Sequence, residues 1–357
     1  MVVKRYNYFM IVLYLPKYGV PLDDPCCYPL GFMYVSSILK AFGNEVKVLN
    51  CNIFDCDLSK ELEGATDIFF TGFEEFEAPI KEAAGLARLA GAKTHLGGAI
   101  ATYAPKVMEG HIDYIYRGEF CPNLPIDKNP WPDYEGFGIE EYHKRHSTRY
   151  MGILTSRGCP HSCTFCNSVC RYRCRSMDSV EAEIDHYKSE YKAEIIVFND
   201  NTLNASKGRF RRICEMMKGK GLAWSAALRL DNLDESLVTL AKDSGLVYAV
   251  VGVESFQQDK LDAMNKQITV KTMEHSLHLL EKHKILYHGN VIMGFEGETE
   301  EQIAEEFEDL KKRPWNIFPV YMRKFAGVKA NESKSKPLSE TFQEYIYSKD
   351  MYCYPGA

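Results

Sequence analysis

The sequence has no long apolar run, no excess of positive charge, and no repeated or low-complexity segment. Its 357 residues contain 43 Lys and Arg against 49 Asp and Glu, a net charge of −6, which gives no electrostatic case for nucleic-acid binding. No apolar stretch reaches the roughly 20 residues that a membrane-spanning helix needs. The apolar run at residues 9–15 is short enough for a buried strand, and no small-residue cleavage site follows it. We therefore expect a cytoplasmic protein with neither a membrane nor a nucleic acid as partner.

Cysteine is not scarce, and its distribution fits a reducing compartment better than a disulfide scaffold. Twelve cysteines lie along the chain, and three of them, Cys159, Cys163 and Cys166, form a C-x-x-x-C-x-x-C motif after an apolar run at residues 151–154. Three thiolates cannot pair off as disulfides without leaving one over. They can hold three irons of a cubane cluster, because Fe–S clusters are built on Cys thiolates. The remaining iron would then be open to a small molecule.

Other metal sites are weaker hypotheses. A structural zinc knuckle is disfavoured, because such sites generally use four ligands in paired C-x-x-C spacing. Cys170, Cys174 and Cys353 could form a second metal site, although free reduced cysteines are the simpler interpretation.

Strands alternate with helices in the first 120 residues. Helical patterns at residues 31–42 and 80–90 lie among short apolar runs at residues 10–15, 46–49, 68–71, 94–96 and 112–116. This alternation predicts an α/β domain with a parallel, doubly wound sheet. Such sheets bind ligands outside the carboxyl ends of their strands, here residues 16–25, 71–76, 97–99 and 117–119.

A second α/β segment is expected after a break. Residues 121–149 are rich in proline and predict an extended linker. From residue 150 to 326 strands are expected at 151–156, 195–199, 223–230, 247–253, 287–293 and 317–324, with helices between them. Six such units fit a partial (β/α)6 barrel, whose active site lies at the carboxyl ends of the strands. Residues 327–357 form a short, polar and then tyrosine-rich C-terminal extension.

The cysteine motif and its context resemble the radical S-adenosylmethionine (SAM) enzymes. Phe165, just before the last cysteine, matches the aromatic residue usual there. In that family the open iron is chelated by the amino and carboxylate groups of SAM, and reductive cleavage gives a 5′-deoxyadenosyl radical. The resemblance implies a [4Fe–4S] cluster on Cys159, Cys163 and Cys166, an oxygen-poor setting, and a reductant protein such as a flavodoxin-like electron donor.

Polar residues at successive expected strand ends would complete the implied SAM site. Asn199 and Asp200 would hold the methionine amino group, and the guanidinium of Arg229 would hold its carboxylate as a bidentate pair. Glu254 would accept the ribose hydroxyls, and Ile292 would contact adenine. Each position alone is more often a cap or turn than a ligand, so the interpretation depends on their recurrence.

The resemblance is to the branch of this family that carries an N-terminal cobalamin domain. The stretches Trp224-x-x-x-x-Arg229-x-Asp231 and Gly252-Val-Glu-Ser255 are similar to that branch, while Phe295-Glu296 departs from its usual Leu-Pro. The N-terminal part resembles the Rossmann-like cobalamin-binding domains. The implied cobalamin contacts are Pro25, Cys26, Cys27, Tyr28, Thr71, Gly72, Phe73, Gly97, Gly98, Ala99, Thr102, Gly118 and Glu119.

The methylmalonyl-type motif D-x-H-x-x-G is absent, so we expect no His ligand to cobalt from such a motif. The alternative is a degenerate Rossmann-like domain that only shields the mouth of the barrel.

The implied function is that of a cobalamin-dependent (class B) radical SAM methyltransferase acting on an unactivated carbon. One SAM would methylate cobalamin, and a second would yield the radical that removes a hydrogen from the substrate. A protein or peptide side chain is the first expectation for the substrate, in the manner of the radical enzymes that modify methyl-coenzyme M reductase. A small metabolite or pigment is the second.

Three alternatives stay open to different degrees. A cobalamin-dependent radical SAM cyclase or rearrangement enzyme acting on a small metabolite would use the same cofactors. A methylthiotransferase is less favoured, because residues 327–357 are short and polar compared with the RNA-binding barrel that such enzymes add. A non-catalytic redox or cobalamin-carrying protein would not explain the polar residues at the strand ends. The sequence does not predict catalytic residues beyond the cofactor ligands.

Overall fold

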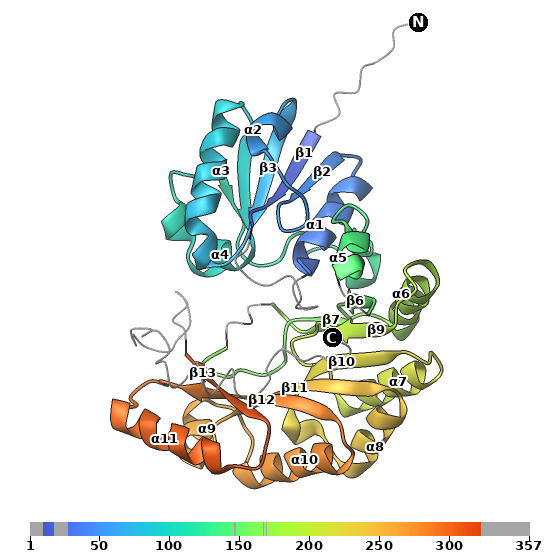
Figure 1. Cartoon of the computed structure of the whole chain (residues 1–357), viewed down its shortest axis with the longest axis vertical. Helices are drawn as coiled ribbons and strands as arrows, with labels where there is room; N and C mark the ends of the chain where they lie inside the picture. Colours follow the sequence, from blue (N-terminus) through green and yellow to red (C-terminus); the bar gives the residue numbers. More distant parts are fainter. Residues whose placement is uncertain (1–9, 18–27, 146–147, 167, 169, 323–357) are drawn as a thin grey trace, which may run out of the picture. The chain divides into compact units, whose positions relative to one another are not determined.

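The computed structural model describes residues 10–17, 28–145, 148–166, 168 and 170–322. The chain divides into two compact units, Met1–Ser147 and Thr148–Ala357. Each unit is built on a parallel sheet with helices packed against it (Figure 1). No helix in the described ranges is both long and apolar enough to cross a membrane.

The first unit contains a five-stranded parallel sheet. Its strands have the order β2-β1-β3-β4-β5, so the order reverses between β1 and β3. A reversal of this kind is where doubly wound sheets bind ligands. The elements are β1 (Met10–Leu15), α1 (Leu30–Ala41), β2 (Glu45–Asn50), α2 (Leu58–Glu61), β3 (Ala65–Thr71), α3 (Glu77–Leu89), β4 (Lys93–Gly97), α4 (Gly98–Tyr103), β5 (Tyr114–Ile115) and α5 (Ile139–Arg145).

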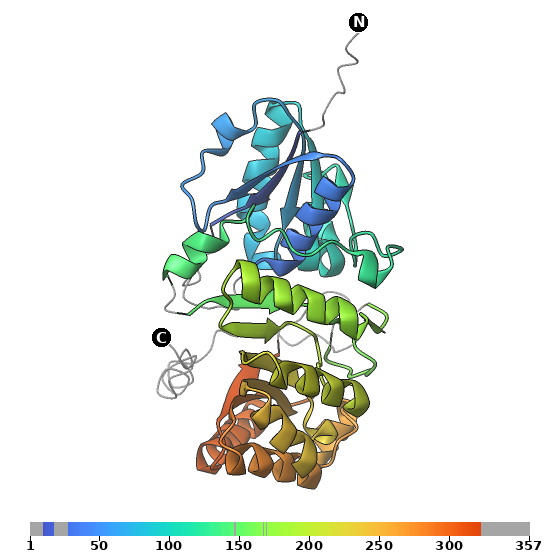
Figure 2. The same ribbon diagram turned by 90° about the vertical axis from the view of Figure 1, so that its right-hand side faces the viewer.

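Helices α1 and α3 lie on opposite faces of this sheet (Figures 1 and 2). Helix α3 buries Ile80 and Ala84 in one apolar cluster with Ile68 and Phe70 of β3. Helix α1 ends before Gly43, whose φ of +84° is the left-handed conformation that commonly closes a helix. The parallel, doubly wound sheet agrees with the expected α/β class.

The segment after β5 is not the extended linker that its prolines predicted. Residues 121–147 belong to the first unit. Tyr134, Phe137 and Tyr142 are buried there, and the ring of Phe137 meets that of Phe32 in α1 at 6.1 Å. These aromatic residues follow the last proline of the segment, Pro132, and the unit boundary lies after residue 147 rather than after 120.

The second unit contains a six-stranded parallel sheet in the order β13-β12-β11-β10-β9-β6. Successive strands are neighbours, as a partial (β/α) barrel requires. The elements are β6 (Tyr150–Ile153), β7 (Ser156–Arg157), β8 (Arg173–Cys174), α6 (Met177–Glu190), β9 (Ile195–Phe198), α7 (Lys207–Lys218), β10 (Ala223–Leu228), α8 (Glu235–Asp243), β11 (Leu246–Glu254), α9 (Gln258–Ala263), α10 (Val270–Lys282), β12 (Leu286–Met293), α11 (Glu300–Lys312) and β13 (Ile317–Tyr321).

The helices of the second unit cover one face of its sheet (Figure 1). Trp224 of β10 lies on this face, because its ring meets Phe210 of α7 at 6.2 Å and its Nε1 donates to the carbonyl of Ser244 at 3.0 Å. Side chains of a strand alternate between faces, so Ser225 lies on the other face. We call that other face the inner face.

Loops at the carboxyl ends of the strands lead into capped helices. The side chain of the residue before α6, α7, α8, α10 or α11 accepts a hydrogen bond from the first turn, and Thr299 forms a full capping box with Gln302. Such caps satisfy N–H groups that a helix start leaves unpaired, which fixes where each loop ends.

Candidate functional site

The cysteine motif lies in a loop that begins at the carboxyl end of β6. Strand β7 pairs antiparallel with β8 and closes the base of this loop, residues 158–172. Gly158 has a φ of +73°, and a Cβ there would lie 2.2 Å from the carbonyl oxygen of Cys170. Only glycine fits this position, so the chain can turn sharply just before the first cysteine.

The three cysteines of the motif are free thiols that lie close together. The Sγ of Cys159 lies 3.8 Å from the hydroxyl of Thr202, and the Sγ of Cys163 lies 3.8 Å from Nη1 of Arg229. Cys166 is near enough to both other thiols to interact with them electrostatically, and its N–H donates to the carbonyl of Cys163 at 3.2 Å. The structure thus brings all three predicted cluster ligands together.

A buried polar atom beside these thiols has no partner among the described residues. It is Nε2 of His161, in the middle of the cysteine motif. A buried group left without a hydrogen bond costs about 1–3 kcal/mol, so an acceptor bound here would stabilise the loop. No three His, Cys, Asp or Glu side chains in the described ranges converge on a single ion, whereas a cubane binds each thiolate through a different iron. Three neighbouring thiols and an unsatisfied nitrogen fit a Fe–S cluster with sulfide and thiolate acceptors.

The residues that follow α9 anchor the cysteine loop. The N–H of Thr164 donates to the carbonyl of Met264 at 3.0 Å, and Nδ2 of Asn265 donates to both the carbonyl and the hydroxyl of Ser162 at 2.9 Å. The next residue, Lys266, is buried. The segment Met264–Lys266 therefore connects the cysteine loop to the end of β11.

Arg229 is buried at the end of β10, and its guanidinium is already largely engaged. Nε and Nη2 each donate to Asp231 at 2.9 Å, and Nη2 also donates to the carbonyl of Lys266 at 2.7 Å. Nη1, beside the Sγ of Cys163, is the nitrogen nearest the cluster ligands. Its place beside the cysteines agrees with the prediction, but the bidentate partner in the structure is Asp231.

Glu254 lies at an irregular end of β11. Its φ is +65°, and the register between β11 and β12 shifts between Gly252 and Glu254. Its Oε1 accepts a hydrogen bond from Nζ of Lys266 at 2.6 Å. A Cβ on Gly252 would lie 2.3 Å from Oε1 of Glu254 and 2.6 Å from Nζ of Lys266, so glycine makes room for this ion pair.

Phe165 and Ile292 meet next to this ion pair. Ile292 of β12 is buried in an apolar cluster with Met264 and Phe295, and Phe165 packs against it. Nζ of Lys266 lies 5.8 Å from the centre of the Phe165 ring, within the range of a cation–π contact. Phe165 of the cysteine loop thus lies near Ile292 and the Glu254–Lys266 ion pair, and Arg229 lies beside Cys163 of the same loop.

The carboxylate of Asp200, predicted to bind the amino group of SAM, is buried and hydrogen-bonded within the protein. It is 2% exposed, and its carboxylate accepts hydrogen bonds from the N–H and hydroxyl of Thr155 at 3.0 and 2.9 Å and from the hydroxyl of Ser156. All of these bonds join β9 to the segment before the cysteine loop. The Asp200 carboxylate is therefore engaged within the protein, while the neighbouring Asn199 is only partly buried.

The loops of the first unit bring most of the predicted cobalamin residues to one edge of its sheet. A Cβ on Gly98 would lie 2.4 Å from the hydroxyl of Thr71 and 3.4 Å from the nitrogen of Gly72. The hydroxyl of Thr102 donates to the carbonyl of Gly98 at 2.8 Å and accepts from the N–H of Gly118 at 3.0 Å. The ends of β3 and β4 and the segment after β5 are thus in mutual contact.

The remaining predicted cobalamin residues differ in placement. Phe73 is 54% exposed, and Gly97, Ala99 and Glu119 are partly buried. Tyr28 is buried, with its ring 4.8 Å from that of Tyr142 and 6.0 Å from that of Tyr134, so it is a core residue of the unit. Pro25, Cys26 and Cys27 lie outside the described residues, as does Cys353 of the hypothetical second metal site.

Three residues near the cysteines were missed by the sequence analysis. Thr202, His161 and Lys266 contact or adjoin the predicted ligands but have no motif of their own. Asp231 could have been found from the sequence, because it is the last residue of the stretch Trp224-x-x-x-x-Arg229-x-Asp231 that carries the family resemblance.

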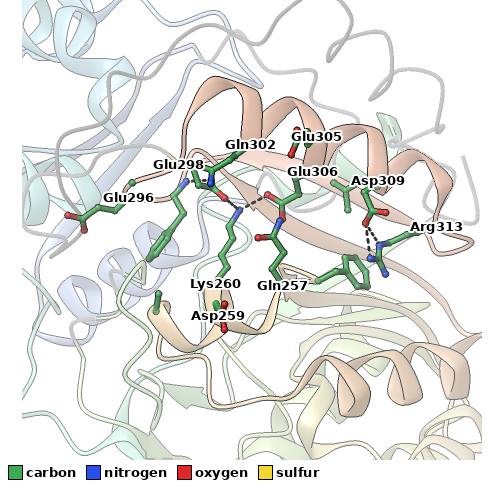
Figure 3. Close-up of a pocket in the computed structure, with 15 residues that line it drawn as sticks. Gln257, Asp259, Lys260, Glu296, Glu298, Gln302, Glu305, Glu306, Asp309 and Arg313 are labelled. Atoms are coloured by element: carbon green, nitrogen blue, oxygen red, sulfur yellow. Dashed lines mark hydrogen bonds and ion pairs between the residues drawn. The ribbon is translucent and has the colours of Figure 1, made fainter.

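A separate pocket of about 590 Å³ lies between α9, α11 and the loop before α11 (Figure 3). At its base Nζ of Lys260 lies 2.5 Å from Glu298 and 2.7 Å from Glu306, and Glu306 also accepts a hydrogen bond from Ser255 at 3.0 Å. These buried charges satisfy one another. None of the predicted SAM residues lines this pocket.

Comparison with known proteins supports the assignment of the second unit. Residues 153–310 match the Radical SAM superfamily model. The chain is 29% identical to the uncharacterized methyltransferase PH0819 of Pyrococcus horikoshii, over 52% of this chain and 42% of the relative. It is also 29% identical to the anaerobic magnesium-protoporphyrin IX monomethyl ester cyclase of Rubrivivax gelatinosus, over 45% of this chain and 30% of the relative. The chain thus spans less than half the length of these relatives.

A solved structure shows the same fold over both units. It is the radical SAM methyltransferase TsrM from Kitasatospora setae with cobalamin and a [4Fe–4S] cluster bound. The TM-score is 0.69 at 16% identity, over 89% of this chain and 72% of that one. Residues 153–310 thus match the Radical SAM superfamily model, and the fold of the chain is similar to that of TsrM.

Proposed function

We propose that the protein is a cobalamin-dependent radical SAM methyltransferase that transfers a methyl group to an unactivated carbon. The observation that supports this most is the set of three free thiols, Cys159, Cys163 and Cys166, beside Arg229 and Glu254 in a radical SAM domain. The second support is the likeness of the fold over both units to an enzyme solved with cobalamin and a [4Fe–4S] cluster.

The chain's own residues would hold and orient the cofactors. The three thiolates would bind the cluster, and Nη1 of Arg229 would face the carboxylate of SAM. The Glu254 carboxylate would accept ribose hydroxyls, while Phe165 and Ile292 offer apolar surface for adenine. The loops around Thr71, Gly98 and Gly118 would contact cobalamin. When bound, these groups supply the electron, the radical source and the methyl carrier, and the protein supplies position and shelter from water.

The class of substrate is a separate part of the proposal. A protein side chain was the first expectation from sequence, but neither of the two relatives named above is described as acting on a protein. The cyclase acts, by its name, on a porphyrin ester, so a small molecule is the better supported class. Cyclisation with the same cofactors is the second candidate function, and this relative is the observation that favours it.

Product analysis separates the two candidates. We would reconstitute the chain anaerobically with iron, sulfide and cobalamin, and supply a reductant and SAM with a deuterated methyl group. A methyltransferase forms both 5′-deoxyadenosine and S-adenosylhomocysteine, whereas a cyclase forms 5′-deoxyadenosine without S-adenosylhomocysteine. The Cys163→Ala variant is the control and should lose 5′-deoxyadenosine. Absence of both products from a chain with an intact cluster would contradict the proposal.

A further inference from the structure

Three polar residues on the inner face of the second unit's sheet lie on neighbouring strands and are not among the predicted SAM residues. Neighbouring strands contribute one each: Ser225 of β10, Tyr248 of β11 and His288 of β12. We call them the inner-face triad. They precede the strand ends that carry Arg229, Glu254 and Ile292.

Strand register and hydrogen bonding place these side chains together. Ser225 faces away from the helices, and its partner across the ladder is Tyr248, so both lie on the inner face. The hydroxyl of Tyr248 is hydrogen-bonded to Nδ1 of His288. The rings of His288 and Phe318 of β13 form a T-shaped pair with their centres 5.9 Å apart. The triad thus extends across adjacent strands.

One member of the triad has a buried hydrogen-bonding group without a partner. Ser225 is 3% exposed, and its Oγ has no partner among the described residues. His288 is only partly buried, and its Nδ1 is hydrogen-bonded to Tyr248. A buried hydroxyl without a partner costs about 1–3 kcal/mol. A polar group of a ligand that hydrogen-bonds to Ser225 would recover that free energy. If Ser225 served only the fold, the hydroxyl would stay without a partner.

The surroundings of the triad determine what kind of group fits. Val197, the ladder partner of Ser225, and Val250, the ladder partner of His288, are both apolar. Ala227 and Phe318 extend this apolar surface along the same face. Burial lowers the pKa of His288, so the imidazole is neutral at physiological pH. The triad therefore offers neutral donors and acceptors, and neither a carboxylate nor an ammonium ion would find an opposite charge there.

We propose that the inner-face triad binds a neutral hydrogen-bonding group, an amide or a hydroxyl, at the far end of the substrate. This inference rests on the proposed function, because it takes the inner face of the barrel as the place where substrate lies. His288 precedes Ile292 by four residues, or about 13 Å along a strand. No single amino-acid side chain spans that distance, so the substrate class is an elongated small molecule with a neutral polar end.

Histidine NMR on the full-length chain tests this directly. We would label the ring nitrogens and titrate acetamide, acetate and methylammonium into the reconstituted protein. Acetamide should shift the signals of His288, assigned by their loss in His288→Asn. The other two probes should leave them in place. Ser225→Ala and Tyr248→Phe should each weaken acetamide binding by about three- to tenfold, because each removes one hydrogen bond.

The controls separate this inference from the proposed function. His278→Asn alters an exposed residue of α10 and should leave the response to acetamide unchanged. Thermal melting shows whether Ser225→Ala and Tyr248→Phe remain folded. No turnover is involved, so a chain that lacks methyl transfer but shows the acetamide shift refutes only the proposed function. A missing His288 shift, or an equal shift with acetate, overturns the inference.

Discussion

The ammonium of Lys266 lies 2.6 Å from the carboxylate of Glu254, and both side chains are buried beside the cysteine loop. Glu254 holds a left-handed backbone conformation with φ of +65° to make this contact. Such conformations in a residue other than glycine cost about 1–3 kcal/mol and persist where the surroundings enforce them. Because the carbonyl of Lys266 also accepts from Arg229, one residue connects the ends of β10 and β11.

We predict that Lys266→Met destabilises the second unit by about 3–5 kcal/mol, because it leaves the Glu254 carboxylate buried without a partner. The double variant with Glu254→Gln should recover part of that loss. The measurement is urea unfolding monitored by tryptophan fluorescence. A Trp131→Phe background leaves Trp224 and Trp315, both in the second unit, as the only tryptophans. Lys271→Met, on the exposed side of α10, is the matched control and should change stability by less than about 0.5 kcal/mol. A double variant no more stable than Lys266→Met would argue against coupling of the pair.

The cysteine loop gives a second prediction. Replacing Cys159, Cys163 and Cys166 together with alanine should remove about four irons per chain after anaerobic reconstitution, since these thiolates are the proposed cluster ligands. Iron analysis and the visible absorption of the cluster measure the loss. Cys214→Ala changes a buried thiol of α7 and should keep the iron. Retention of iron and absorption in the triple variant would refute the assignment.

The Asp200→Ala variant tests whether Asp200 positions the segment before the cysteine loop or binds SAM. Asp200→Ala leaves one N–H and two hydroxyls of Thr155 and Ser156 without their acceptor, so we expect a loss of about 3 kcal/mol in stability. The dissociation constant for SAM, measured by equilibrium dialysis on the fraction that retains its cluster, should change less than twofold. Asp243→Ala, an exposed acid at the end of α8, is the control. A large change in SAM affinity with normal stability would restore Asp200 as a ligand.

The sequence predicted those features that depend on short-range patterns. The cysteine spacing, the alternation of strands and helices, and glycines such as Gly98 were all visible as local signals, and the structure has a parallel sheet in each unit. Two placements could not be foreseen because they depend on long-range packing. Asp200 is engaged by Thr155, 45 residues away, and Tyr28 is buried against Tyr142.

The segment at residues 121–147 shows how a local signal can mislead. Its prolines suggested an extended linker, but Tyr134, Phe137 and Tyr142 carry enough apolar surface to pack on the first unit. Proline restricts the backbone without preventing burial of the side chains around it. The inner-face triad could not be foreseen for a related reason: its members are far apart in sequence, and only strand register brings them together.

Acid stability of the first unit provides a further prediction. The Asp113 carboxylate accepts hydrogen bonds from the N–H and the hydroxyl of Thr94, both at 2.8 Å, and these bonds lower the pKa of Asp113. Its stabilising contribution is therefore present above the unfolded pKa of about 3.9 and is lost as pH falls through the folded value. The stability difference between the native chain and Asp113→Asn should shrink as pH falls below about 4. Thermal unfolding at several pH values measures it, and a difference independent of pH would contradict this.

The last prediction concerns cobalamin. Of the histidines in the described part of the first unit, His95 lies within β4 bonded to Asp67 and Tyr116, His143 is buried in α5, and His111 is exposed. None lies among the loops around Gly72, Gly98 and Gly118 at the carboxyl ends of the strands. We therefore expect cobalamin to bind without a protein nitrogen on cobalt, a state that favours the reduced, methyl-accepting metal. Electron paramagnetic resonance of the cob(II)alamin form should show no nitrogen superhyperfine splitting from a histidine, so the spectrum should be unchanged in His95→Gln. Splitting that disappears in His95→Gln would show that a histidine does ligate the cobalt. A chain with an intact cluster that binds no cobalamin would remove the methyltransferase proposal altogether.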